Sequence, residues 1–306
     1  MVRFIISRIL QAVVVIFAII TITFFMGKAV PGGPFANERQ TTPHIEEALN
    51  AYYGLDQPTI VQFGRYLSGF IRGDLGPSFK YEGRSINEIL GDSLPISATL
   101  GGMAFLFALV IGLPIGILAA ARRNTVFDYV PMSLAMVGIC LPTFVMGPLL
   151  AIFFGIKLNW FNVALWIDST DWVLPSLTLG LYYAAYVARL TRAGMLDTLS
   201  QDYIRTARAK GASEFSVLTK HGLKGGLQPV LAFMGPAFAG MLAGSFVIEK
   251  VFRIPGLGTH FIEAALNRDI TLLIGTAVFY GTLLLLLNLI VDIVQILTNP
   301  KLTFSS

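Results

Sequence analysis

The sequence predicts an all-α polytopic membrane protein with six transmembrane helices and both termini on the cytoplasmic side. Of its 306 residues, 55% are hydrophobic and only 13% are charged, and the mean hydropathy is +0.70. These values lie outside the usual range of soluble domains. The 22 Lys and Arg and the 18 Asp and Glu are also missing from six long stretches of the chain. This distribution excludes a soluble enzyme.

The six uncharged stretches are each about 17 to 28 residues long, and a helix needs about 20 residues to cross the hydrocarbon core of a bilayer. Each stretch is therefore predicted to cross the membrane once. They comprise residues 9–27, 96–121, 129–156, 172–188, 225–248 and 270–291. The fourth is short, and we expect its flanking residues Asp171 and Arg189 to lie at the two interfaces.

The first stretch follows Arg3 and Arg8, as the apolar core of a secretory signal peptide would. It is longer than the core of about 7 to 15 residues that a cleaved signal has, and residues 27–29 make a poor cleavage site. We interpret it as a retained signal anchor, with a cleaved signal as the alternative.

The orientation follows from Lys and Arg near the ends of the stretches, because basic loops resist translocation. With the N-terminus inside, the inner segments hold about twelve basic residues against four acids, seven of the twelve in residues 189–224. The formal net charge of +4 is then a difference between two membrane faces. A nucleic-acid partner is not expected, because a groove that binds nucleic acid needs aromatic residues interleaved with basic ones on a soluble surface.

Residues 28–95 form a long outer segment with two predicted helix starts, at Thr42-Pro43 and at Pro58. The apolar face of the second helix is predicted to contain Ile60, Phe63, Leu67 and either Phe70 or Ile71. A turn-rich loop at 73–79 follows, and Ser85 with Glu88 forms a capping box. The segment is either a cap on the membrane helices or a docking surface for an external partner.

The inner segment, residues 189–224, is patterned as two short helices separated by a glycine. Ser200 is a candidate cap of the first helix, with Asp202 in its opening turn, and Gly211 ends that helix. Ser213 and Glu214 begin the second helix. Its apolar face is expected to contain Phe215, Leu218 and His221. Helices this short cannot span a bilayer, so they are predicted to lie across the cytoplasmic surface.

Glycines inside the stretches indicate close approach of helices. Gly112 with Gly116, and the pair Gly240 and Gly244, place small residues on one helix face. For the pair Gly240 and Gly244, static packing is a better explanation than a moving interface.

Few residues point to a cofactor or to catalysis. Cys140 is the only cysteine and lies in an apolar stretch, where we expect a small buried hydrophobic residue. His44, His221 and His260 are far apart in the sequence, so no metal site is expected. No group of catalytic residues lies inside the stretches, which argues against an intramembrane enzyme.

The chain also lacks the features of a self-powered transporter. It contains no G-x-x-x-x-G-K-[ST] phosphate-binding loop, so it is not expected to hydrolyse ATP or to hold a cofactor. The stretches carry no central charge of the kind that ion-coupled carriers use, and Glu249 and Asp292 are interpreted as interfacial or capping charges at span ends. If the chain is a transporter, it is expected to draw its energy from another subunit.

The inner segment resembles the coupling loop of type I ABC importer permeases, in its peptide-permease variant. The resemblance rests on Tyr-Ile-Arg-Thr-Ala-Arg-Ala-Lys-Gly at 203–211 and on His-Gly-Leu-Lys at 221–224. The resemblance extends along the chain. It includes residues 31–35, 73–81, 247–249, 255–258 and 265–269. Residues 205–207 occupy the Glu-Ala-Ala places of the family motif, and Gly211 occupies the glycine place. Arg205 and Lys224 depart from the general pattern in charge and shape.

The resemblance implies a type I ABC importer permease fold and assigns the ATPase-coupling role to residues of this loop. The residues are Tyr203, Arg205, Thr206, Ala207, Gly211, His221 and Leu223. It implies a first helix with an extracytoplasmic segment over 1–95, an ABC transmembrane type-1 domain over 96–299 and a cytoplasmic tail over 300–306. Residues that bind the substrate are not indicated.

As a function, the resemblance implies the permease subunit of an ATP-driven importer of oligopeptides in a bacterial inner membrane. The implied partners are a second homologous permease forming a heterodimer, one or two ABC ATPase subunits, an extracytoplasmic peptide-binding protein and membrane lipids. Importers of dipeptides, nickel, or antimicrobial or murein peptides share the pattern and remain alternatives. From another class, a six-span channel remains, although no stretch shows a charged ring or a filter-like loop.

Overall fold

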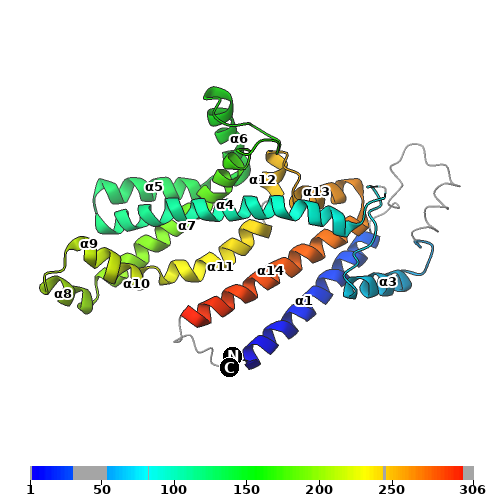
Figure 1. The fold of residues 1–306 in the computed structure, drawn as a ribbon, viewed down its shortest axis with the longest axis horizontal. Helices are drawn as coiled ribbons and strands as arrows, with labels where there is room; N and C mark the ends of the chain where they lie inside the picture. The colour runs from blue at the N-terminus through cyan, green and yellow to red at the C-terminus, as the bar shows by residue number, and fades with distance from the viewer. Residues whose placement is uncertain (1, 30–53, 82, 244–245, 299–306) are drawn as a thin grey trace. The chain divides into compact units, whose positions relative to one another are not determined.

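The computed structural model describes residues 2–29, 54–81, 83–243 and 246–298, and the regular elements among them are helices (Figure 1). The chain divides into two compact units. Unit 1 comprises Met1–Ile96 and Pro255–Leu286, and unit 2 comprises Ser97–Ile254 and Leu287–Ser306. The predicted all-α class is confirmed for the described residues. The predicted division at residues 95 and 96 follows the sequence alone and stays a prediction.

Unit 1 contains all of α1 (Val2–Ala29), α3 (Thr59–Ile71) and α13 (Leu257–Asn267). It also contains the first parts of α4 (Ile86–Ala121) and α14 (Ile270–Thr298). Ile20 and Phe24 of α1 form a buried cluster with Ile274 and Val278 of α14. A methyl group at Gly27 would come within 2.7 Å of Ile270, so the two helices approach closely at their ends.

Helix α3 begins after Pro58, as predicted, and packs its aromatic face on α1 and α14. Phe63, Leu67 and Phe70 contact the buried cluster, and the rings of Phe63 and Phe24 lie 5.3 Å apart. One detail of the predicted face is wrong, because Ile60 is 67% exposed. Of the two alternatives at its end, Phe70 packs on the cluster and Ile71 is 77% exposed. The predicted helix start at residues 42–43 lies outside the described residues.

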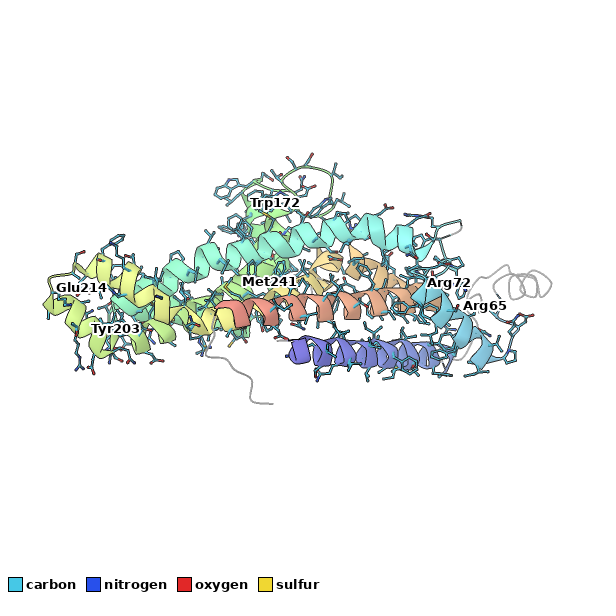
Figure 2. The ribbon with its side chains drawn as sticks, turned by 60° about the horizontal axis from the view of Figure 1, so that its bottom comes forward. Arg65, Arg72, Trp172, Tyr203, Glu214 and Met241 are labelled. Carbon is cyan, nitrogen blue, oxygen red and sulfur yellow. The ribbon has the colours of Figure 1, made fainter. Side chains whose placement is uncertain are left out.

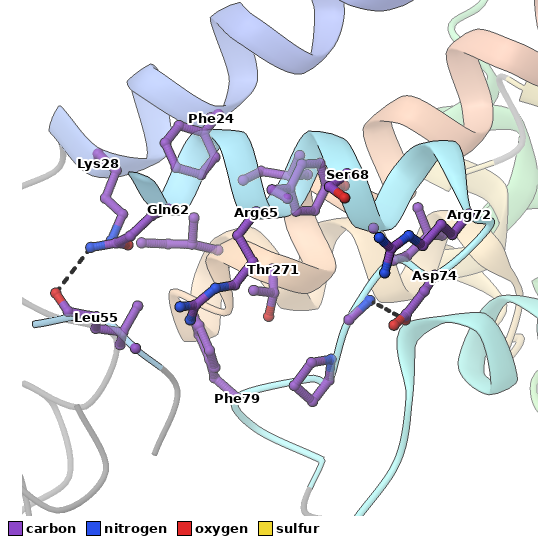
Figure 3. A pocket seen from close by; sticks show the side chains of 18 residues that line it. Phe24, Lys28, Leu55, Gln62, Arg65, Ser68, Arg72, Asp74, Phe79 and Thr271 are labelled. Carbon is purple, nitrogen blue, oxygen red and sulfur yellow. Dashed lines mark hydrogen bonds between the residues drawn. The ribbon is translucent and has the colours of Figure 1, made fainter. Parts of the chain in front are cut away.

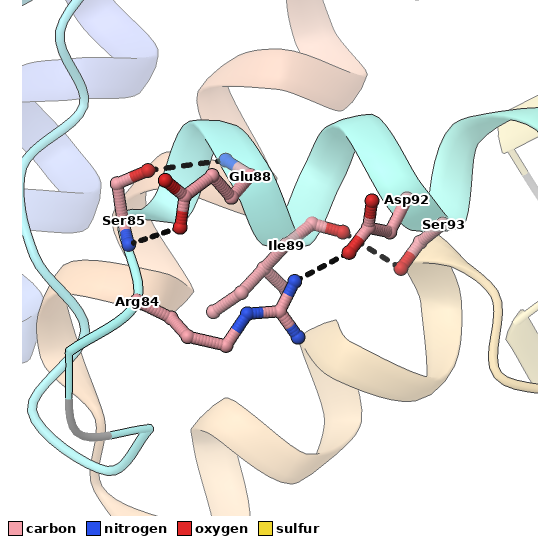
Figure 4. Close-up of polar contacts among 6 residues, drawn as sticks. All are labelled: Arg84, Ser85, Glu88, Ile89, Asp92 and Ser93. Carbon is pink, nitrogen blue, oxygen red and sulfur yellow. Dashed lines mark hydrogen bonds and ion pairs between the residues drawn. The ribbon is translucent and has the colours of Figure 1, made fainter.

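The predicted capping box at the start of α4 is confirmed (Figure 4). Ser85 Oγ accepts the Glu88 N–H at 3.2 Å, and the Ser85 N–H donates to Glu88 Oε2 at 3.2 Å. Arg84 forms an exposed ion pair with Asp92 on the same helix. The helix therefore begins before the uncharged stretch, because its first turn satisfies its own backbone groups.

The turn-rich loop of residues 73–79 is held by a buried aspartate at the start of α14. Ser78 Oγ donates to Asp269 Oδ2 at 2.5 Å, and the Leu272 N–H donates to Asp269 Oδ1 at 3.0 Å. Gly73 and Gly76 have φ values of +78° and +87°, in the left-handed region that favours glycine. One carboxylate thus caps a membrane helix and fixes the loop beside it.

Unit 2 is organised around α7 (Val173–Leu199). This helix packs against α5 (Val126–Cys140), α6 (Thr143–Leu150), α10 (Leu223–Gly226) and α11 (Gln228–Ala243). The second half of α4 also crosses α7 at very close range. A methyl group at Gly112 would lie 2.7 Å from the Ala184 carbonyl oxygen, and one at Gly116 would lie 2.5 Å from that of Ala188. The predicted close packing at these two glycines is confirmed. Gly240 would meet the Tyr183 hydroxyl at 3.0 Å, and Gly244 lies outside the described residues.

The third uncharged stretch is not one straight helix, and its single crossing of the membrane stays a prediction. It is divided into α5 (Val126–Cys140), α6 (Thr143–Leu150) and the π-helix η1 (Ala151–Lys157), with a bend of 109° between α5 and the following pair. Leu141 is extended at ψ 119°, because the proline ring at 142 disfavours the helical conformation of the residue before it.

Four helices of the described chain are long and apolar enough to cross a membrane, or up to five if the bent pair counts as one span. They lie in Ile6–Ala29, Ile86–Ala121, Gln228–Val251 and Ile270–Ile290. The candidate span Gln228–Val251 contains α11 (Gln228–Ala243) and α12 (Phe246–Val251), and it includes two residues outside the described part. Helix α7, which holds the fourth predicted span, is 27 residues long but is not among them. Six spans and the orientation of the termini stay predictions.

Two side chains in unit 2 differ from their sequence interpretation. Glu249 is fully buried, and Ser97 Oγ donates to its Oε1 at 2.8 Å, so it is not an exposed interfacial charge. Cys140, expected to be buried, is exposed on the last turn of α5. The apolar neighbours of Cys140 in the sequence indicated a membrane environment, and they could not show whether the helix face met protein.

Candidate functional site

The inner segment folds into a helical hairpin that returns to the end of α7. Helix α8 (Asp202–Ala209) is followed by α9 (Glu214–Ser216), the π-helix η2 (Val217–Gly222) and α10 (Leu223–Gly226). Figure 2 shows Tyr203 of α8 and Glu214 of α9 close to each other at one end of the unit. We call residues 200–226 the coupling hairpin.

Gly211 forms the turn between the two halves of the hairpin. Its φ of +82° lies in the left-handed region, and a methyl group added there would meet no atom within 4 Å. The Gly211 N–H donates to the Arg208 carbonyl at 2.9 Å, and the Ala212 N–H donates to the Ala207 carbonyl at 3.2 Å. This is a Schellman termination, which confirms that the glycine ends the first helix.

A bidentate ion pair bridges this turn. Arg208 Nε donates to Glu214 Oε1 at 2.7 Å, and its second nitrogen donates to Oε2 at 3.1 Å. The hydrogen bonds from Arg208 lower the pKa of Glu214 from its ordinary value, and Glu214 raises the pKa of the guanidinium in turn. A planar fork on a carboxylate fixes orientation as well as distance, so the pair holds α8 and α9 in one arrangement.

Buried apolar contacts anchor the hairpin on α7. Ile204 and Val217 are fully buried, and so is Met195 of α7. A methyl group at Gly226 would lie 2.5 Å from the Met195 sulfur, and one at Gly194 would overlap the Gly226 carbonyl oxygen. Because side chains cannot fit between these segments, the hairpin and the end of α7 are expected to move together.

The outer face of the hairpin combines exposed aromatic and basic side chains. Tyr203 is 50% exposed and Phe215 is 77% exposed. Arg205 makes only a long, exposed contact with Asp202, at 3.5 Å. Exposed aromatic rings next to basic side chains are typical of a surface that binds a partner protein.

A cavity of about 440 Å³ opens beside this face, between the end of α4 and the hairpin. Its basic wall comes from Arg122, Arg123 and Arg208, and Glu214 also lines it. Leu196, Leu199 and Leu218 form its apolar wall. The cavity therefore has one basic wall and one apolar wall.

The residues assigned to coupling fall into three groups. Tyr203, Arg205 and Thr206 are exposed on α8, while Ala207, His221 and Leu223 are half-buried. Gly211 forms the turn. The structure brings Tyr203 and His221 together, because the tyrosine hydroxyl donates to the His221 carbonyl at 3.5 Å.

Two expectations for this segment are wrong. Ser200 does not cap α8, because α7 continues to Leu199 and the Ser200 hydroxyl donates back to the Asp197 carbonyl. The second helix buries Val217, whereas Phe215, expected on its apolar face, points outward. Ser213 does cap the second helix, accepting the Ser216 N–H at 3.3 Å.

Sequence reasoning missed a buried ion pair that supports the hairpin. Asp128 of α5 is 1% exposed and accepts two hydrogen bonds from Arg192 of α7, at 2.5 and 2.8 Å. The Asn124 N–H also donates to Asp128, at 2.9 Å. The partners are 64 positions apart, so no local pattern could have paired them.

Within the described residues, no group of three or more His, Cys, Asp or Glu side chains is placed to hold a metal ion. What the coupling hairpin does present is a set of exposed aromatic rings and cations.

Two family models match the chain. Residues 112–304 match the binding-protein-dependent transport system inner membrane component, and residues 1–101 match the N-terminal part of the same membrane component. The oligopeptide transport system permease protein OppB of Escherichia coli strain K12 is 42% identical over 99% of this chain and all of its own length. That of Haemophilus influenzae is 40% identical with the same coverage. The dipeptide transport system permease protein DppB of Bacillus subtilis is 42% identical over 99% of this chain and 98% of its own.

Solved structures give the same fold. The inward-facing MetNI methionine ABC transporter has a chain that superposes with a TM-score of 0.60 at 16% identity, covering 69% of this chain and 96% of that chain. A chain of an amino acid ABC transporter with histidines superposes at 0.55 and 18% identity, covering 68% and 94%.

Proposed function

This chain belongs to the family of binding-protein-dependent transport system inner membrane components, and from this premise we propose that it is the permease subunit of an ABC importer of peptides. The observation that carries the function is the full-length identity of 40 to 42% to oligopeptide and dipeptide permeases. The chain is a multi-pass protein of the inner membrane. Uptake of labelled peptide by vesicles containing the chain and its partner subunits tests the function, and ATP-independent or absent uptake would contradict it.

Within the peptide class, we propose oligopeptides as the substrate, since the chain resembles oligopeptide permeases along its length. Relatives named for oligopeptide and for dipeptide transport are both 42% identical to the chain, so a competition assay has to decide. Unlabelled pentapeptide is expected to displace labelled pentapeptide from uptake more effectively than a dipeptide does. The reverse order would assign dipeptides.

We propose that the coupling hairpin docks on an ATPase subunit at the cytoplasmic face. The exposed rings of Tyr203 and Phe215 and the adjacent basic cavity support this, because desolvated aromatic anchors carry much of the energy of protein interfaces. The close packing of the hairpin on α7 would transmit movement of the ATPases to a long helix of the bundle.

Site-directed cross-linking tests the docking proposal. Cys140 is exposed and is first replaced by alanine so that it does not react. A cysteine at position 203 is expected to cross-link to the co-purified ATPase, and one at position 60, on the exposed face of α3, is expected not to. Deleting residues 207–211 is expected to abolish coupling of ATP hydrolysis to uptake. Normal uptake after that deletion would refute the proposal.

The assembly is proposed to contain a second, homologous permease, one or two ATPase subunits and an extracytoplasmic peptide-binding protein. The chain itself holds no phosphate-binding loop, so ATP hydrolysis is assigned to the separate subunits. Purified alone, the chain is expected to hydrolyse no ATP and to conduct no ions. Ion conduction by the purified chain would favour a six-span channel instead.

Six spans with both termini in the cytoplasm are proposed, with α7 as a span although it is less apolar than the others. Packing of α7 between α4, α5 and α11 supports this, because a helix covered by protein needs less apolar surface than one facing lipid. A cysteine at position 208 on the Cys140→Ala background is expected to react only with reagents that enter the cytoplasm. Labelling of position 208 from outside would overturn the topology.

A further inference from the structure

A cavity of about 450 Å³ lies in unit 1, where α1 ends and α14 begins, with α3 as its third wall (Figure 3). The first uncharged stretch ends at residue 27, the last begins at residue 270, and these two residues are in close contact. The cavity therefore lies beside the ends of two membrane helices, at the level of the lipid headgroups.

The walls of this cavity are amphiphilic. Among the described residues that line it, the basic ones are Lys28, Arg65 and Arg72, and the acidic one is Asp74. Asp74 already accepts the Gly76 N–H at 2.9 Å. Figure 3 shows Arg65 reaching from α3 toward Phe79, and Arg72 directly after the end of that helix. Apolar side chains line the rest of the cavity, namely Phe24, Leu75, Phe79, Ile270 and Ile274.

The cations of the cavity have no acidic partner among the described residues. Among the residues that the structure describes, no carboxylate lies within ion-pair distance of Lys28, Arg65 or Arg72. Within the described part of the chain, the Arg65 guanidinium donates to the neutral side chain of Gln57, at 2.9 Å. A cluster of like charges on an apolar wall is stabilised by an anion that also brings apolar surface.

A buried hydroxyl group in the same cavity also lacks a partner. Tyr66 lines the cavity and packs its ring on Phe24, and its buried hydroxyl finds no hydrogen-bond partner within the described part of the chain. Burial raises the pKa of Tyr66, so the hydroxyl remains a donor at neutral pH. A buried donor without a partner is costly, and a bound anion would satisfy it.

We propose that this cavity binds an anionic phospholipid, with the phosphate at Arg65 and the neighbouring Tyr66, between Lys28 and Arg72 (Figure 3), and the acyl chains against Phe24 and Ile274. A lipid is favoured over a soluble anion because apolar side chains make up much of the wall and because the cavity lies at the ends of two membrane helices. The lipid would hold α3 against α1 and α14. This inference does not depend on the transported substrate.

Native mass spectrometry of the full chain, purified from membranes in mild detergent with its accompanying subunits, tests the proposal. The probes are phosphatidylglycerol and phosphatidylcholine with identical acyl chains, added to delipidated protein. We expect one tightly bound phosphatidylglycerol and much weaker phosphatidylcholine. Arg65→Gln and Arg72→Gln are each expected to weaken phosphatidylglycerol binding about fivefold, as one cation near an anionic lipid surface contributes.

Two further variants separate the site from general effects of charge and folding. Tyr66→Phe keeps the ring and is expected to weaken phosphatidylglycerol binding about tenfold, because a hydrogen bond to a charged group is lost. Arg84→Gln removes an exposed arginine of the same segment outside the cavity and is expected to leave binding unchanged. Equal binding of the two lipids would overturn the proposal, and so would unchanged binding by Tyr66→Phe and the arginine variants together. Displacement of the lipid by inorganic phosphate or by a peptide would also overturn it.

Discussion

Replacing Gly211 with valine gives the most direct test of the coupling hairpin. A side chain at this position would meet no atom within 4 Å, so the substitution introduces no clash. The cost arises from the backbone alone. At φ +82°, a residue with a Cβ atom is destabilised by about 1 to 2 kcal/mol, and β-branching adds to this cost.

This strain acts on the turn that orients α8 relative to α9. The Schellman hydrogen bonds at Gly211 and Ala212 and the pair of Arg208 with Glu214 all depend on the left-handed residue. A penalty of about 1 to 2 kcal/mol reduces the population of the native turn relative to alternatives by about 5- to 30-fold. We expect peptide uptake per ATP hydrolysed to fall by a similar factor in proteoliposomes containing the full transporter.

Gly211→Asn is the matched control, because asparagine adopts the left-handed region far more readily than valine while adding a side chain of similar size. It is expected to retain most of the coupling. Equal loss in the asparagine and valine variants would show that bulk at the partner interface is responsible. Normal coupling in Gly211→Val would refute the role of the turn altogether.

Three further substitutions test the packing around the site. Gly116→Ala is expected to lower the free energy of unfolding in detergent by about 1 to 3 kcal/mol, since its methyl group would press on the α7 backbone. Gly102→Ala is the control and is expected to leave the free energy of unfolding unchanged, because a methyl group there has open space. Arg192→Gln is expected to cost about 3 kcal/mol by leaving the buried Asp128 charge without its partner, and adding Asp128→Asn should restore much of that stability. The ion pair with Arg208 lowers the pKa of Glu214. The stabilisation of the fold by this pair is therefore complete above the ordinary pKa of 4.5 and disappears as the pH falls through the lowered pKa. The melting temperatures of wild type and Glu214→Gln should converge only in acid.

Local patterns predicted the features that depend on neighbouring residues. The capping box at Ser85, the start of α3 after Pro58 and the turn at Gly211 are all as expected, because each is satisfied by hydrogen bonds or backbone preferences within a few positions. The close approach at Gly112 was also visible, since a missing side chain permits it. A proline at 142 marked the third stretch, but the sequence did not show that the chain bends there by 109°.

The sequence by itself determined that this is a helical membrane protein, because charges are excluded from hydrocarbon wherever the chain crosses it, and it determined which loop carries the coupling motif. Only the tertiary structure decided which side chains are buried. Phe215 is exposed although it is apolar, while Asp128 and Glu249 are buried although they are acidic. Burial of the two acids depends on partners far away in the sequence, Arg192 and Ser97, and hydropathy along the chain contains no information about such pairs.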